Sequence, residues 1–341
     1  MMRNLFIILL TALTFAACKN DIDINAEYKE TPIIYGLLNA DSTTHYVKVY
    51  KSFLDEETSA IDIAQNPDSI YYSDSIILYI ERQSTGQKTY LTKVNGDDLN
   101  IGKPMEDGLF ANSPNILYTF NQTLNKDDNY TLYFENPLTG KKAKASTRIV
   151  NDFQINFPFE GYKFNFTSPN NFEIQWRSAA NSRINDVLLR FWYQEWNVNT
   201  PDNKVWKNVD LRLANNVISN SSNGGEQLSA TIDGVRFYNF LKNTITVDAD
   251  TRRQAPEECI ELIFSVGGEA LYNYIRVNQA QSGITSLQTL TEYTNVEGGL
   301  GIFSSRRFLK RGGIGLTNPA LDSLSCGQTT RELNFVNFNC F

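Results

Sequence analysis

The sequence predicts a mainly β protein, built of immunoglobulin-like or fibronectin III-like β-sandwich domains with a few helices inserted in its second half. Short runs with alternating apolar and polar residues are separated by turn sequences such as Asn95-Gly96 and Asn136-Pro137, a pattern typical of sandwiches. Aromatic residues make up 12% of the chain, which favours strands over disorder. The 341 residues suit two domains, and we place them at residues 31–150 and 151–341.

Six strands are expected in the first half. The run from His45 to Tyr50 alternates most clearly, with His45, Val47 and Val49 on one face, as in a half-buried strand. The strands expected in this half cover residues 32–38, 45–50, 75–81, 88–94, 116–120 and 130–135.

The second half mixes strands and helices. Asp233 can cap a helix near residues 235–243, with Val235, Tyr238 and Leu241 on one stripe. A second helix is expected near residues 269–281, and a short third one starts at Asn318-Pro319, because proline favours the first turn of a helix. The strands expected here cover residues 172–176, 186–196, 260–266 and 333–338.

The N-terminus reads as a lipoprotein signal. Arg3 is followed by an apolar run that ends at Ala16-Ala17, and Cys18 comes next, an arrangement that resembles a bacterial lipobox. Residues 1–17 would be removed and acyl chains such as palmitate attached to Cys18, with residues 18–30 as the lipidated tether. The apolar run is too short to span a bilayer, so multiple acyl chains would supply the anchor. The alternative is an ordinary signal peptide with a chance cysteine.

Lys19, Asp21 and Asp23 follow the lipidation site. They resemble the export signal that sends Bacteroidetes lipoproteins to the outer face of the outer membrane. The expected location is therefore the outer membrane, on its cell-surface side. A plain polar tether is the alternative.

Charge and cysteine content narrow the function further. The formal net charge of −7 without a basic cluster argues against nucleic acid as a partner. Cys259, Cys326 and Cys340 remain besides Cys18, and an oxidising compartment permits a disulfide. Three pairings are open; we favour Cys326–Cys340, which closes a short loop, with Cys259 as a small apolar residue.

Few residues in the sequence indicate a catalytic, metal-binding or cofactor-binding site. His45 is the only histidine, and the sequence has neither the paired spacing of a zinc site nor a nucleotide-binding motif. We therefore expect no metal, no cofactor and no catalytic residue. Asp97-Asp98 and Asp127-Asp128 read as solvated turns. Two carboxylates from distant strands leave no mark in a sequence, so a carboxylate-only hydrolase stays open.

One strand face stands out as a binding candidate. On the strand 187–196, Val187, Leu189, Phe191 and Tyr193 share a face, and the opposite face carries Arg190, Trp192, Gln194 and Trp196. Tryptophans beside an arginine are typical of protein interfaces and of sugar-stacking sites. The alternative is that another part of the chain covers this face.

Three further segments carry a family resemblance. The Ile-Tyr-Gly-Leu-Leu-Asn sequence at 34–39, the aromatic helix at 237–240 and the glycine-containing segment 293–306, together with the lipobox, resemble uncharacterised Bacteroidetes outer-membrane lipoproteins. The wider group is often encoded beside TonB-dependent transporters. The resemblance implies a non-enzymatic accessory or interaction subunit of an outer-membrane β-barrel complex, in transport or assembly; a glycan-binding surface lipoprotein is the alternative.

Short Asp-Ser sequences also resemble the Bacteroidetes O-glycosylation signal. Each consists of an aspartate, a serine and a threonine or aliphatic residue. The candidate serines are Ser42, Ser69, Ser75 and Ser323.

Overall fold

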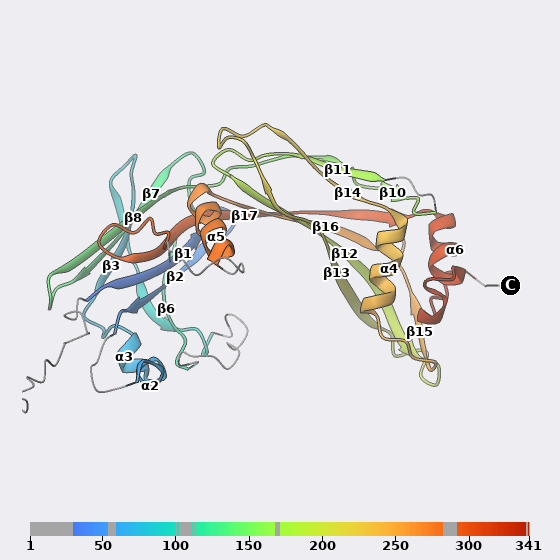
Figure 1. The fold of residues 1–341 in the computed structure, drawn as a ribbon, viewed down its shortest axis with the longest axis horizontal. Coiled ribbons are helices and arrows are strands. Elements are labelled where there is room, and N and C mark those ends of the chain that lie inside the picture. The colour runs from blue at the N-terminus through green and yellow to red at the C-terminus, as the bar shows by residue number, and fades with distance from the viewer. Residues whose placement is uncertain are drawn as a thin grey trace, which may run out of the picture.

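The computed structural model describes residues 30–53, 59–99, 101, 111, 113–167, 171–281, 292–338 and 340, with the backbone alone at 280 and 281. The expected signal peptide 1–17, the lipidation site Cys18 and the export residues Lys19, Asp21 and Asp23 lie outside these ranges. The described part is elongated, and long strands join a lobe near the N-terminus to a lobe near the C-terminus (Figure 1).

The first lobe contains two helices and most of the short strands. These are β1 (Pro32–Leu38), β2 (Thr44–Lys51), α2 (Ala60–Ala64), α3 (Pro67–Ile70), β3 (Ile77–Arg82), β4 (Gln87–Tyr90), β5 (Thr92–Asn95), β6 (Ile116–Asn121), β7 (Asn129–Asn136) and β8 (Lys141–Arg148).

The second lobe and the connection follow. Their elements are β9 (Ile155–Phe157), β10 (Lys163–Phe164), β11 (Phe172–Arg177), β12 (Ile184–Asn197), β13 (Val205–Ile218), β14 (Gln227–Ile232), α4 (Gly234–Thr244), β15 (Thr251–Gln254), β16 (Ile260–Gly267), α5 (Glu269–Gln281), β17 (Leu300–Leu316), α6 (Asn318–Cys326) and the 3₁₀ helix η2 (Arg331–Leu333).

A ten-stranded sheet of the described strands runs through both lobes. Its order is β13-β12-β16-β17-β1-β2-β6-β5, with β10 also on β17 and β15 on β12. Strand β17 makes this continuity possible, because its first part pairs in parallel with β1 and its later part pairs antiparallel with β16. The sheet therefore has one face turned toward the two cores and one outer face common to both lobes.

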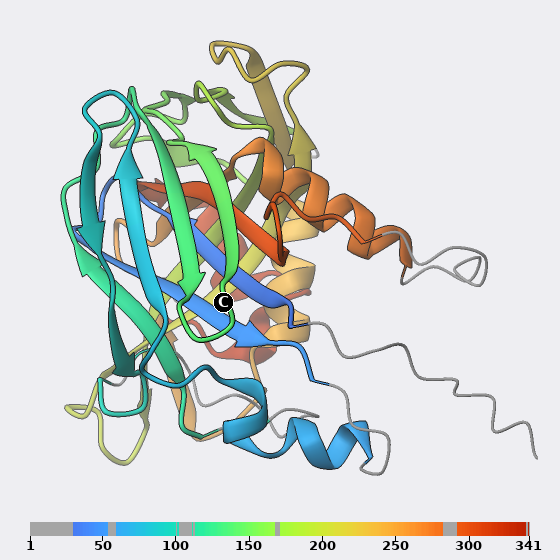
Figure 2. The same cartoon turned by 90° about the vertical axis from the view of Figure 1, so that its left-hand side faces the viewer.

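In the first lobe, the inner face of β1, β2 and β6 packs on the separate sheet β4-β3-β7-β8. Ile34, Val47 and Phe134 all belong to this core. Val296 and Phe303 belong to the same core, so residues from beyond the expected boundary near Val150 complete the first lobe. Figure 2 shows β1 and β2 between α5 above and the helices α2 and α3 below.

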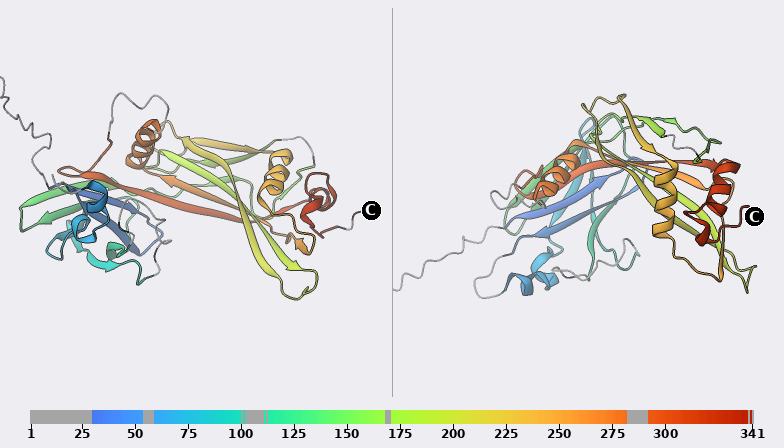
Figure 3. Two further views of the ribbon diagram at one scale, coloured as in Figure 1. Left: turned by 60° about the horizontal axis from the view of Figure 1, so that its bottom comes forward. Right: turned by 45° about the vertical axis from the view of Figure 1, so that its right-hand side comes forward.

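In the second lobe, the sheet β14-β11-β9 and helices α4 and α6 cover the inner face of β12 and β16. The core is rich in aromatic side chains, among them Trp176, Phe191, Phe237 and Phe264. The β12–β13 hairpin extends beyond the rest of this lobe (Figure 3).

The expected helices are confirmed. Asp233 caps α4 by accepting a hydrogen bond from the Arg236 backbone N–H at 2.8 Å, and Tyr238 and Leu241 face the core. The placement of Val235 on the packed stripe is wrong, since its side chain is 65% exposed. Phe237 fills that place instead, because the first turn of α4 lies at the edge of the core.

The mainly β class with few helices is confirmed, but the finer immunoglobulin or fibronectin III assignment is not. The expected strand 88–94 is two strands: β4 pairs with β3 and β5 with β6, and they separate at Leu91. The expected strand 333–338 is wrong. Its residues form the end of η2 and an isolated bridge between Arg253 and Phe335, because Phe335 packs as a single anchor against Phe191 and Tyr193.

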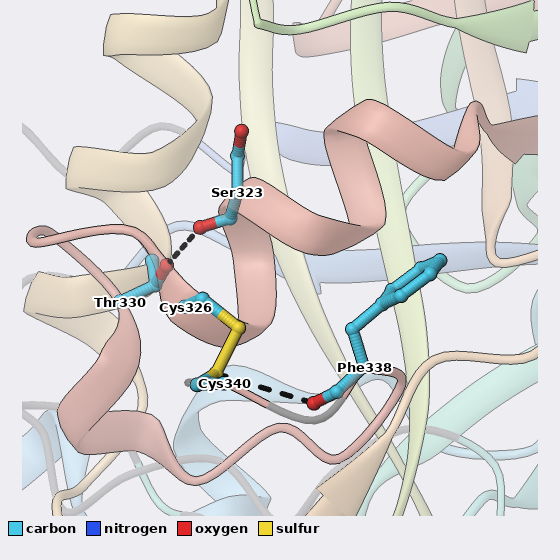
Figure 4. Close-up of a disulfide and its surroundings, with 5 residues drawn as sticks. All are labelled: Ser323, Cys326, Thr330, Phe338 and Cys340. Atoms are coloured by element: carbon cyan, nitrogen blue, oxygen red, sulfur yellow. Dashed lines mark hydrogen bonds between the residues drawn. A yellow bond between two sulfur atoms is a disulfide. The ribbon is translucent and has the colours of Figure 1, made fainter.

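The favoured disulfide is present. Cys326 at the end of α6 is bonded to Cys340, with 5.3 Å between their Cα atoms (Figure 4). Cys259 is a buried free thiol in the second core, and burial raises its pKa to about 12. The packing role expected for Cys259 is confirmed.

We expect the Cys326→Ala, Cys340→Ala double variant to lose about 3 kcal/mol of stability, the value for closing a loop of this length. The loop carries Leu333 and Phe335, which belong to the second core. Hydrogen exchange should therefore accelerate first in residues 327–338. A uniform acceleration across both lobes would contradict a local role for the bond.

Candidate functional site

The four residues expected to form an interface do lie together. Arg190, Trp192, Gln194 and Trp196 stand on the outer face of β12, and each side chain is partly exposed. The residues between them, Leu189, Phe191 and Tyr193, are buried in the second core. The predicted alternation is therefore confirmed, and this row of side chains remains accessible to solvent.

Strand β13 widens this surface. Its residues Trp206, Asn208 and Asp210 pair with Gln194, Trp192 and Arg190, and directly opposed residues share a face of a sheet. Trp206 is 55% exposed. We call the set the aromatic face: Arg190, Trp192, Gln194, Trp196, Trp206, Asn208 and Asp210.

Sequence reasoning missed the β13 part of this surface. The available signal was the spacing of Val209, Leu211 and Leu213, which is the period of a strand. Lys207 and Asn208, which are exposed, obscure that period at the start of the strand.

Ion pairs and stacked cations hold the aromatic face in shape. Arg190 donates from Nε and Nη2 to the two carboxylate oxygens of Asp210, both at 2.8 Å, and this hydrogen bonding raises the pKa of Arg190. Its guanidinium lies 5.6 Å from the Trp192 ring centroid, and Lys204 Nζ lies 4.5 Å from that of Trp196. Both tryptophans are therefore positioned before any partner arrives, which lowers the entropy lost on binding.

The outer face continues toward the first lobe. Phe308 on β17 is partly exposed under the Arg306 guanidinium, 5.0 Å from its ring centroid. Helix α5 lies on this face at the junction of the lobes, where the Leu271 N–H donates to Ser304 Oγ at 3.2 Å. The aromatic face lies on the second-lobe side of α5.

An ion-pair network joins the lobes on the inner side of β17. The almost fully buried Arg307 contacts Asp41 at 2.7 Å and Asp152 at 2.5 Å. Lys126 also donates to Asp152, at 2.9 Å. These contacts, the Lys126 hydrogen bond foremost, lower the pKa of Asp152. One buried guanidinium thus connects a first-lobe turn to the first segment of the second lobe.

Removing that guanidinium should weaken the protein in a pH-dependent way. We expect Arg307→Met to lower the free energy of unfolding at pH 7 by about 2 kcal/mol, the value of hydrogen bonds to charged groups. Because the pKa of Asp152 is lowered in the folded state, its stabilising effect exists above its unfolded pKa of about 3.9 and is lost as the pH falls through the folded value.

Urea unfolding at pH 7 and pH 3 measures this effect. The difference between wild type and Arg307→Met should shrink at pH 3. Arg212→Met removes an exposed guanidinium whose hydrogen bond, within the described part of the chain, goes to Asn215, and it should change stability little at either pH. An Arg307→Met deficit of the same size at both pH values would show that the ion pairs do not cause it.

The other residues considered in the sequence for chemistry, His45, Asp97 and Asp128, are held by contacts within the protein. His45 is buried, stacks on Phe120 with 4.8 Å between ring centroids, and places Nε2 3.0 Å from the Gln122 carbonyl oxygen; burial lowers its pKa. Burial opposes the ionisation of Asp128, but hydrogen bonds from Ser84 and Arg82 lower its pKa to about 2. Asp97 accepts hydrogen bonds from Ser113 and the Asn115 backbone.

The residues that the structure describes contain no group of three or more His, Cys, Asp or Glu residues able to hold a metal ion. The same residues include no helix that is both long and apolar enough to cross a membrane.

The four candidate glycosylation serines differ in access. Ser75 is exposed, with its Oγ 2.7 Å from that of Ser73. Ser42, Ser69 and Ser323 are partly buried, and Ser42 donates to the Thr44 carbonyl oxygen at 2.6 Å. Ser75 is therefore the serine most open to a transferase, and glycosylation stays a prediction.

A comparison with models of known protein families finds no match for this chain. A comparison with curated proteins finds none either. The resemblance to Bacteroidetes outer-membrane lipoproteins accordingly stays a prediction from the motifs.

Proposed function

We propose that this protein is a non-enzymatic surface lipoprotein, anchored to the outer membrane through Cys18 and exported by the Lys19, Asp21 and Asp23 signal. It binds an outer-membrane β-barrel protein or its complex as an accessory subunit, and the aromatic face is its contact surface. The observation that carries the proposal is the pair of partly exposed tryptophans, Trp192 and Trp196, each with a stacked cation. Tryptophan and arginine dominate the energetic centres of protein interfaces.

The length of the tether supports a partner in the same membrane. The segment from Cys18 to Glu30 spans at most ~40 Å when extended. The Asn136 side chain donates to Glu30 Oε1 at 2.9 Å, and although burial opposes it, this bond and those from Thr139 and Tyr72 lower the pKa of Glu30. The tether therefore enters the first lobe at a fixed point, which keeps that lobe near the bilayer.

The stacked cations favour a protein over a glycan. A sugar ring stacks on a flat face of an indole, and a cation already occupies one flat face of Trp192 and of Trp196. A protein partner can use the ring edges and the cations themselves. Glycan binding is the second candidate, because Gln194 and Asn208 place side-chain amides beside the tryptophans. A glycan array tests it directly.

We expect Trp192→Ala with Trp196→Ala to reduce co-purification of the outer-membrane partner at least tenfold and to leave the fold intact. Each truncation at an interface centre removes about 2 kcal/mol or more, and both side chains are only partly buried. The measurement is quantitative mass spectrometry of proteins recovered with the tagged chain from detergent-solubilised outer membranes.

The matched control removes two exposed aromatic side chains elsewhere. Phe159→Ala with Tyr90→Ala truncates residues that are 60% and 63% exposed and lie outside the aromatic face, and partner recovery should not change. Equal losses in the two double variants would point to non-specific capture. A folded Trp192, Trp196 variant with full recovery would remove the aromatic face from the interface.

A further inference from the structure

A cavity lies between α5 and the outer face of β1 and β2. Its volume is about 560 Å³, and its lining includes Tyr35, Tyr46, Leu271, Tyr274, Asn39 and Arg306. Small-molecule sites commonly measure 300–1,000 Å³. It lies on the first-lobe side of α5, while the aromatic face lies on the other side, so the two are separate surfaces.

The apolar wall of this cavity is mostly aromatic. The Tyr35 and Tyr274 rings meet edge to face with 6.4 Å between centroids, and Tyr46, Leu271 and the buried Ile302 complete the wall. Ring edges and faces arranged in this way favour a flat aromatic guest over a flexible chain.

The polar side of the cavity offers donors. The Ser42 hydroxyl donates to the Thr44 carbonyl oxygen, and the Thr44 hydroxyl donates to Asn121 Oδ1. Asn39 Oδ1 accepts a hydrogen bond from the Asp41 N–H at 3.1 Å. His45 also lines the cavity, and its Nε2 lies 3.0 Å from the Gln122 carbonyl oxygen. Besides the tyrosine hydroxyls, the Asn39 amide group and the Arg306 guanidinium remain as donors. Within the described residues, Arg306 has no acidic partner, and its stacking contact is Phe308.

The charged groups in and around the cavity determine which end of it is positive. The nearby Asp41 is paired with Arg307, so it does not neutralise Arg306. Burial, Tyr274 and the negative charge of Glu292 raise the pKa of Tyr35 to about 12. A tyrosine hydroxyl is uncharged at neutral pH, so Tyr35 adds no charge to the cavity. The positive end of the cavity is therefore at Arg306.

We propose that this cavity binds a small aromatic carboxylic acid, with its ring against Tyr46 and Tyr274 and its carboxylate on Arg306 and Asn39. Arginine is the side chain best shaped for a carboxylate, which it can bind through two parallel hydrogen bonds. The site is independent of the aromatic face and would hold its ligand with or without a protein partner.

Calorimetric titration of the full chain tests the proposal with three probes: phenylacetate, its uncharged analogue phenylacetamide, and glucuronate. Phenylacetate should bind, and phenylacetamide should bind at least tenfold more weakly because it lacks the charge. Glucuronate carries the same carboxylate without an aromatic ring. Tighter binding of glucuronate than of phenylacetate would overturn the aromatic assignment.

Arg306→Gln should weaken phenylacetate binding at least tenfold. The matched control is Lys310→Gln, which removes the same charge from the same face of β17 outside the cavity, where Lys310 pairs with Glu261 at 3.4 Å; its affinity should equal wild type. Equal binding of acid and amide, equal losses in the two variants, or no phenylacetate binding at millimolar concentration would overturn the proposal. The comparison of phenylacetate with phenylacetamide uses the wild-type chain, so it tests the proposal even if Arg306→Gln does not fold.

Discussion

Trp176→Ala should lower the free energy of unfolding by about 3–5 kcal/mol, the range for truncating a fully buried aromatic side chain. Trp176 is 0% exposed and packs against Phe264 with 5.5 Å between ring centroids. Its Nε1 donates to Asn185 Oδ1 at 3.3 Å, and Asn185 is itself fully buried. The truncation therefore leaves both a cavity and an acceptor without its donor.

Denaturant unfolding measures this loss, and Trp206→Ala is the matched control. Trp206 is an exposed tryptophan on β13, and surface truncations usually change stability by less than about 1 kcal/mol. A Trp206→Ala loss as large as that of Trp176→Ala would mean that Trp206 packs against something in the folded chain, which would remove it from the accessible aromatic face.

Cys18→Ala should abolish membrane attachment. The proposed acyl chains would need the Cys18 thiol, and each buried methylene contributes about 0.8 kcal/mol to anchoring. The apolar segment before Cys18 is too short to span a bilayer by itself. Labelling with radioactive palmitate and fractionation of the membranes measure the effect. Without the acceptor thiol, the chain should carry no label and should not sediment with the membrane.

Cys259→Ala is the control for this experiment. Cys259 is a buried free thiol in the second core, and its loss should leave palmitate labelling unchanged. Label that still enters the Cys18→Ala chain, or label lost from Cys259→Ala, would contradict acylation at Cys18.

Local sequence patterns identified the elements in which packing and periodicity agree. The alternation at 45–50 and 186–196 predicted strands that the structure places in β2 and β12, because one face of each strand is buried. Strand β8 escaped prediction because its inward residues are Ala143 and Ala145, whose small side chains give a weak apolar signal. The later part of β17 escaped as well, because Arg306, Phe308 and Lys310 on its outer face are exposed.

Contacts between distant segments could not be read from the sequence. One face of β12 was predictable from alternation alone, but the partners of Arg190 and Gln194, which are Asp210 and Trp206, depend on the register of β12 with β13. The cavity under α5 depends on β1, β2, α5 and β17 meeting, and no local pattern records that meeting. The disulfide could be predicted because the short sequence separation of Cys326 and Cys340 favoured this pairing.

The parallel pairing of β1 with β17 constrains the order in which the chain can fold. A chain that emerges N-terminus first presents β1 with one edge open, since Leu37 and its neighbours pair with residues 300–305 at the far end of the sequence. Open strand edges invite wrong pairing, and contacts so distant in sequence form slowly. A fragment that ends at Val150 would lack both this neighbour and Phe303, which fills the first core. The first lobe can therefore reach its native state only after the segment around residues 300–305 has been made and has paired with β1.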